Sequence, residues 1–134
     1  MIEKQLSIFL ENKPGVLAKM CRTLADHEIN IRGLSISDTV DHAVVRLVVT
    51  DPRKAIHVLG EHGMLVVETD VLALDLPDKP GKLAEIAGKL ARAKINIEYA
   101  YGSSDHSEGV VFVRVSDIKK AVQVLAPRGP KKGL

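Results

Sequence analysis

Residues 6–15 read LSIFLENKPG, and residues 72–81 read LALDLPDKPG. Pro14 and Pro80 mark the same point in the two stretches, and their offset of 66 positions aligns the rest of the chain without a gap. About twenty identities fall at this single offset, mostly at proline, glycine and apolar positions, which indicates an internal repeat. We therefore predict two modules of one kind, residues 1–67 and residues 68–134, the second ending in a short basic tail rich in proline and glycine.

Each copy of the repeat carries the pattern of a strand, a helix, two strands and a second helix. Leucine and isoleucine alternate with other residues at positions 6, 8 and 10, as on one face of a strand. After the Pro-Gly turn, Leu17, Met20 and Leu24 recur at helical spacing, and Asp51-Pro52 has the residue types that begin a second helix. Two strand–helix–strand crossovers predict an α+β fold of the ferredoxin-like type (βαββαβ), an antiparallel sheet with its helices on one face.

The end of the repeat differs between the copies. In the first copy, residues 64–67 read MLVV and predict a fourth strand, which runs almost directly into the first strand of the second copy. The matching residues 130–133 read PKKG, which cannot form a regular ladder or bury an apolar face. We therefore predict that the second copy lacks its last strand, and that no flexible linker separates the copies.

Composition narrows the class of protein. Hydrophobic residues make up 46% of the chain and aromatic residues 3%, so the core must consist of Val, Ile, Leu and Ala. The net charge of +2 gives no large field of one sign, which argues against nucleic acid or membrane as partner. Without a leader or an apolar run of membrane-spanning length, a cytoplasmic location is the default expectation.

Motifs of catalysis and of cofactor or metal binding are missing from the sequence. It contains no Gly-rich phosphate loop, GxSxG or HExxH, and its histidines lack metal-site spacing. Residues 103–106, SSDH, have the residue types of a triad, but neighbours in one polar turn cannot converge as nucleophile, base and orienting group. Cys21 lies on the predicted inner helix stripe and is expected to be a core residue. We therefore expect no enzyme, no catalytic residue, no metal and no cofactor.

The two Pro-Gly stretches, each followed by a helix and then by Ile29-Asn30-Ile31 or Ile95-Asn96-Ile97, resemble the ACT domain of amino-acid-regulated enzymes. The resemblance covers nearly the whole chain and implies an allosteric regulatory protein or sensor that binds a free amino acid where two such domains abut. Carried over to this chain, it implies two pseudo-symmetric binding sites. One joins Asn12, Gly15, Val16 and Leu17 to Asn96, and the other joins Asp78, Gly81, Lys82 and Leu83 to Asn30.

The chemistry of an amino acid fits these residue types. Gly15 and Gly81 open helices whose first N–H groups can hold an anion, and the oxygens of Asn12 and Asp78 can accept from an ammonium group. The charge of Asp78 disfavours a nearby carboxylate, so the Asn12 site is the preferred one. The structural alternative is that Asn12 and Asp78 cap helices or turns, and that the asparagines at 30 and 96 adopt a left-handed backbone.

Other functions and partners stay open at this point. The stretch SIFLENKPGVLAKM is similar to the start of acetolactate synthase small subunits, which implies branched-chain amino acids as ligands and an enzyme as partner. A ferredoxin-like RNA platform is a further alternative, with Tyr99 and Tyr101 as stacking residues. Apolar residues also alternate out of phase with the core set and predict a homodimer. They are Phe9, Val44, Val48, Val71, Ala73, Val110 and Phe112.

Overall fold

A computed structural model describes residues 1–38, 40, 42–77, 79–105 and 108–126. Its elements occur in the predicted order, and those of the second copy begin about 66 positions after those of the first. They are β1 (Ile2–Glu11), α1 (Val16–Asp26), β2 (Ile31–Asp38), β3 (His42–Val49), α2 (Pro52–Glu61), β4 (Leu65–Pro77), α3 (Lys82–Arg92), β5 (Ile97–Asp105), β6 (Glu108–Val115) and α4 (Ile118–Leu125). The α+β, ferredoxin-like prediction is confirmed.

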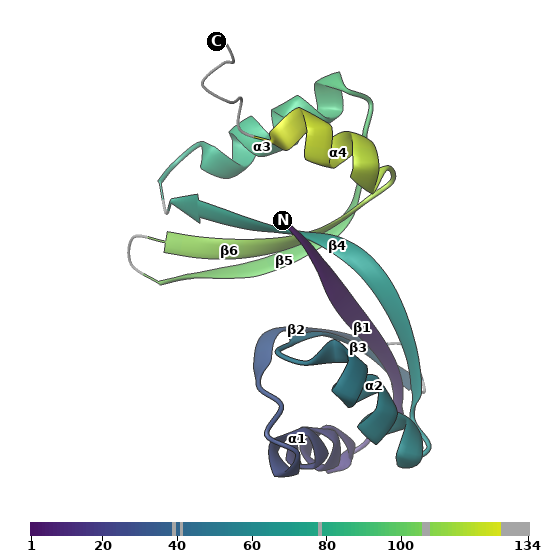
Figure 1. Cartoon of the computed structure of the whole chain (residues 1–134). Helices are drawn as coiled ribbons and strands as arrows, with labels where there is room; N and C mark the ends of the chain where they lie inside the picture. The colour runs from purple at the N-terminus through teal and green to yellow at the C-terminus, as the bar shows by residue number, and fades with distance from the viewer. Residues whose placement is uncertain (39, 41, 78, 106–107, 127–134) are drawn as a thin grey trace. The chain divides into compact units, whose positions relative to one another are not determined.

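The strands follow the order β2-β3-β1-β4-β6-β5 (Figure 1). β1 pairs with β3, β2 with β3, β4 with β6 and β5 with β6, all antiparallel. β4 is one strand of 13 residues that ends the first copy and begins the second, as the apolar run had predicted. The chain divides into two compact units, Glu3–Asp70 and a second one that combines Met1–Ile2 with the chain from Val71 onward.

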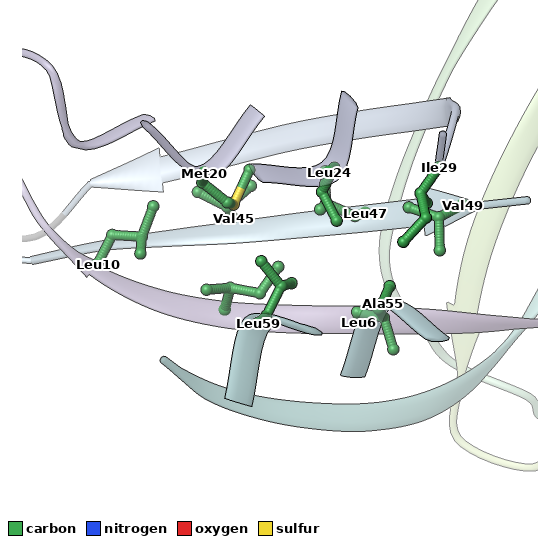
Figure 2. Packing of buried hydrophobic residues seen from close by; sticks show 11 residues of the cluster. Leu6, Leu10, Met20, Leu24, Ile29, Val45, Leu47, Val49, Ala55 and Leu59 are labelled. Carbon is green, nitrogen blue, oxygen red and sulfur yellow. The ribbon is translucent and has the colours of Figure 1, made fainter. Parts of the chain in front are cut away.

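The core of the first unit lies between the sheet and its two helices. Leu6 and Ile8 of β1 are fully buried, because the alternation of the strand turns them to the face that α1 and α2 cover. Figure 2 shows Met20 and Leu24 of α1 packed against this face. Cys21 packs half-buried at the margin, in agreement with its predicted role in the core.

The second unit repeats this packing with α3 and α4 on one sheet face (Figure 1). Leu72 of β4 and Leu90 of α3 are fully buried in its core. The backbone N–H of Ala73 donates to the carbonyl of Met1 over 2.7 Å, so the first two residues lie beside β4. They take the edge position of the last strand of a ferredoxin-like sheet. The predicted absence of that strand concerns residues 130–133, which lie outside the described residues.

Helices α2 and α4 both begin with an aspartate that caps the helix. Asp51 accepts a hydrogen bond from the backbone N–H of Lys54 over 3.1 Å, and Asp117 accepts one from that of Lys120 over 3.1 Å. The predicted cap at Asp51 is confirmed, and these bonds satisfy N–H groups that a helix start leaves without a partner. No helix in the described part of the chain is long and apolar enough to cross a membrane.

The sheet face away from the helices is less open than the sequence suggested. Val48, Val71 and Phe112 are buried, and the Phe112 ring lies 5.5 Å from that of Tyr101, centroid to centroid. Phe9, by contrast, is 42% exposed. Only part of the predicted apolar surface is therefore available to a partner.

Candidate functional site

A cavity of about 430 Å³ opens beside the Pro-Gly turn of the second copy. The end of β4, the turn and the start of α3 form one side of it, with Leu76, Pro77, Lys79, Lys82 and Leu83. Strands β5 and β6 form the other side, with Ala100, Tyr101, Gly102, Gly109 and Val111. All of these residues belong to the second unit.

The turn directs the start of α3 toward the cavity. Gly81, the N-cap residue, has a φ of 90°, a left-handed conformation that glycine adopts without a steric penalty. The N–H of Lys79 donates to the carbonyl of Pro77 over 2.9 Å, and that of Lys82 to the carbonyl of Lys79 over 3.4 Å. Gly15 repeats this geometry in the first copy with a φ of 89°. Glycine is therefore a backbone requirement of both turns.

The first turn of α3 presents backbone donors. The N–H of Glu85 donates to the carbonyl of Gly81 over 2.9 Å and makes the first α-helical bond of this end. The N–H groups of Leu83 and Ala84 have no backbone partner among the described residues. Such groups lie at the positive end of the helix dipole and favour an anion.

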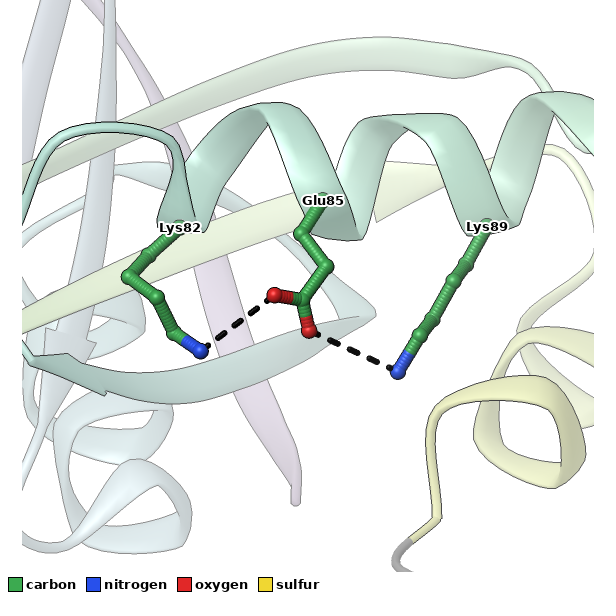
Figure 3. A network of polar contacts seen from close by, with 3 residues as sticks. All are labelled: Lys82, Glu85 and Lys89. Atoms are coloured by element: carbon green, nitrogen blue, oxygen red, sulfur yellow. Dashed lines mark hydrogen bonds and ion pairs between the residues drawn. The ribbon is translucent and has the colours of Figure 1, made fainter.

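The lining of the cavity combines positive charge with apolar walls. Lys82 Nζ lies 3.3 Å from one carboxylate oxygen of Glu85, and Lys89 Nζ lies 3.8 Å from the other (Figure 3). Lys79 makes no ion pair with any residue that the structure describes. Lys79 and Lys82 are the basic residues of the described lining, and Leu76 and Leu83 add apolar surface. This arrangement suits a small anion with an apolar body.

The predicted site residues of the second copy are partly brought together. Lys82 and Leu83 line the cavity, and Gly81 begins the helix beside them. Asp78 lies outside the described residues. Asn30 is not among the lining residues, and its pairing with this turn across the modules stays a prediction.

Asn30 and Asn96 hold the ends of strands through their backbones. The N–H of Asn30 donates to Thr50 Oγ1 over 3.1 Å and its carbonyl accepts from the Thr50 N–H over 3.0 Å. Asn96 and Ser116 repeat both bonds at 3.0 Å each. Both asparagines are exposed.

The hypothesis of a left-handed backbone at the two asparagines is wrong. Among the described residues other than glycine, positive φ occurs at Glu28 and Lys94, with values of 58° and 60°. The left-handed step therefore comes two residues earlier, directly after each helix, and the asparagines follow it in another conformation.

At the first turn, Asn12 is exposed, while Val16 and Leu17 are half-buried against the core. The helix-capping hypothesis for Asn12 is wrong, because the N-cap residue of α1 is Gly15 and no side chain caps this helix. We expect Asn12→Ala to change the free energy of unfolding by less than about 0.5 kcal/mol, as at other surface positions. Urea denaturation of the two proteins measures this change. A loss of about 1 kcal/mol would mean that Asn12 does stabilise the turn or the helix start.

The strand side of the cavity was missed in the sequence. Ala100, Gly102 and Gly109 carry no reactive group and match no motif, so nothing marked them as functional. A comparison of the two copies could have found them, because Gly102 and Gly109 stand where the first copy has Ile36 and Ala43. No group of three or more potential metal-binding side chains occurs among the described residues.

Comparisons with known proteins agree with this architecture. The sequence matches the family described as ACT domain pair over residues 1–128. The crystal structure of protein BT0572 from Bacteroides thetaiotaomicron is 38% identical, with a TM-score of 0.90 over 93% of this chain and 87% of that one. A search of curated proteins finds no match.

Two further solved structures share the fold at low sequence identity. The regulatory subunit of aspartate kinase from Thermus thermophilus, in a ligand-free form, is 15% identical with a TM-score of 0.69, covering 92% of each chain. The corresponding subunit from Thermus flavus is 17% identical with a TM-score of 0.64, covering 93% of this chain and 91% of that one. With its repeat, its fold and the family match over nearly its whole length, the chain belongs to the ACT domain pair family.

Proposed function

We propose that this chain binds a free amino acid and acts as a regulatory module, with no reaction of its own. The observation that carries the proposal is the cavity at the second Pro-Gly turn, which is lined by two lysines and by apolar residues and lies beside the first turn of α3. A free amino acid offers the matching groups, a carboxylate beside a side chain of variable polarity. Membership in the ACT domain pair family, which is typical of amino-acid-binding regulatory domains, supports the same function.

Each part of the ligand has a partner in this proposal. The carboxylate lies at the start of α3, where Lys82 and the N–H groups of Leu83 and Ala84 can donate to it. The ligand side chain lies against Leu76 and Val111. Its ammonium group needs an acceptor oxygen, which Asn30 of the other module would supply in the predicted cross-module arrangement.

Thermal unfolding of the full chain with each of the twenty amino acids tests the proposed function. A ligand present at about 100 times its dissociation constant adds about 2.7 kcal/mol to the free energy of unfolding and raises the melting temperature. We expect a clear increase for a small subset of amino acids. An unchanged melting temperature with every amino acid at millimolar concentration would contradict the proposal.

Lys82→Ala is expected to weaken binding of the responding amino acid by about 1 to 1.5 kcal/mol, or roughly tenfold, because one charge-assisted bond to its carboxylate is lost. The loss of affinity is expected to be modest because the Lys82 side chain is partly exposed and already pairs with Glu85. The control is Lys89→Ala, which removes the other partner of Glu85 but no lining residue of the cavity. Calorimetric titration compares the two variants, and equal affinities would exclude the assigned role of Lys82.

We also propose that the chain forms a homodimer through the sheet face away from α1 and α2. Phe9, Leu65 and Val67 alternate with core residues of β1 and β4, and they are 42%, 65% and 45% exposed. Apolar groups gathered on one face favour association. Light scattering at micromolar concentration is expected to give about twice the chain mass of 14.6 kDa, and Phe9→Lys to lower it. A wild-type mass equal to that of one chain would contradict the dimer.

A further inference from the structure

The two copies differ on the strand side of the cavity. Ala100 and Gly102 of β5 pair with β6 in the register that Leu34 and Ile36 of β2 make with β3. Leu34 and Ile36 project from the first copy with 44% and 47% of their surface exposed. In the second copy the same two positions carry a methyl group and a hydrogen atom. At position 100 the space that a leucine side chain occupies in the first copy is therefore open to the cavity in the second.

The copies differ in charge on the helix side as well. Lys82, the first residue of α3, lines the cavity, whereas Val16 is the first residue of α1 and packs against the core of its own unit. A carboxylate at the first helix would thus meet the apolar side chain of Val16 in place of a lysine. Lys13, the counterpart of Lys79, is already paired there with Glu11 over 3.4 Å. In the second copy, the positive charge of Lys82 and the open space at Ala100 therefore belong to the same cavity.

We infer that each chain holds one amino-acid site, that this site lies in the second copy, and that it selects an amino acid with an apolar side chain. The inference rests on the proposed function and narrows it. Leu76, Leu83 and Val111 offer an acidic or amide side chain no hydrogen-bond partner. Lys79 and Lys82 line the cavity, and their positive charges disfavour a basic side chain. A branched aliphatic side chain needs no hydrogen-bond partner and is not repelled by the lysines.

Calorimetric titration of the full chain with L-leucine, L-glutamate and L-lysine tests the ligand class and the number of sites. L-Leucine is expected to bind with one molecule per chain and at least tenfold more tightly than the other two. Two molecules of L-leucine per chain, or tighter binding of L-glutamate or L-lysine, would overturn the inference and leave the proposed function standing. If none of the twenty amino acids binds, both fall.

Exchange of residues between the copies tests the location of the site. Ala100→Leu places the side chain of the first copy into the cavity, and we expect L-leucine binding to weaken at least tenfold. The control is Leu34→Ala, the reverse exchange at an exposed position of the first copy, which is expected to leave affinity within twofold. Unchanged binding in Ala100→Leu, or a loss in Leu34→Ala, would overturn the location.

A second variant tests the location of the site even if Ala100→Leu does not fold. Leu83 is 54% exposed, so Leu83→Glu leaves the core intact while adding a negative charge to the cavity. Repulsion of the ligand carboxylate is expected to weaken L-leucine binding at least tenfold at low salt. An affinity equal to that of the wild type would place the site elsewhere.

Discussion

Replacing Leu90 with alanine is expected to lower the free energy of unfolding by about 2 to 5 kcal/mol. Leu90 is fully buried where α3 packs on the sheet, in one cluster with Leu72 and Val113. Alanine leaves a cavity that the neighbours on the rigid strands can fill only partly, so the loss exceeds the transfer free energy of the removed methyl and methylene groups. Urea denaturation followed by circular dichroism measures the change.

The matched control is Leu83→Ala, the same substitution seven residues earlier on the same helix. Leu83 is 54% exposed, so we expect the free energy of unfolding without ligand to change by less than about 0.5 kcal/mol. Because Leu83 lines the cavity, its loss should appear in ligand affinity instead. Equal destabilisation by both variants would mean that the described packing of α3 is incorrect.

Gly102→Ala is expected to cost about 1 to 3 kcal/mol of stability and to distort the cavity. A Cβ atom at this position would lie 2.4 Å from the carbonyl oxygen of Val110 and 2.9 Å from the Cα of Val111, both in the backbone of the adjacent strand. No side-chain rotation relieves such contacts, so β5 and β6 must move apart. The cavity lies directly over this pair of strands, and ligand affinity should fall together with stability.

Gly88→Ala is the control for this prediction, because it is expected to raise the free energy of unfolding. Gly88 lies inside α3, and the nearest atom to an added Cβ is Arg92 Nη1 at 3.4 Å, the mobile end of a long side chain. Alanine is preferred over glycine inside a helix by about 1 kcal/mol, so stability should rise. Chemical denaturation of both variants compares the two changes, and a gain in stability from Gly102→Ala would refute the close approach of β5 and β6.

The repeat made most of the fold predictable. Identities at one offset placed a strand, a helix, two strands and a second helix in each copy, and the apolar run after Met64 showed that one strand would join the copies. The position of Met1 beside Ala73 was not predictable, because it rests on a backbone hydrogen bond between segments far apart in the chain. Such a pairing leaves no pattern in the side chains.

The candidate site was predictable on one side only. The resemblance to the ACT domain implied Lys82 and Leu83, which follow the Pro-Gly turn and line the cavity. Asn30 and Asn96, which occur in both copies, were predicted as site residues. In the structure their backbone N–H groups donate to Thr50 and Ser116 and so fix the ends of strands. The opposite wall exists because large side chains are absent from it, and this difference appears only when the two copies are compared position by position.

Nuclear magnetic resonance of the uniformly ¹⁵N-labelled full chain, titrated with the amino acid that raises its melting temperature most, tests amino-acid binding at the second turn most directly. The backbone amides of Lys82, Leu83 and Ala84 should shift with a common saturation curve, together with that of Ala100 across the cavity. Their counterparts in the first copy, among them Leu17 and Ala18, should shift little. Shifts confined to the first copy, or an unchanged spectrum at saturating ligand, would contradict the account.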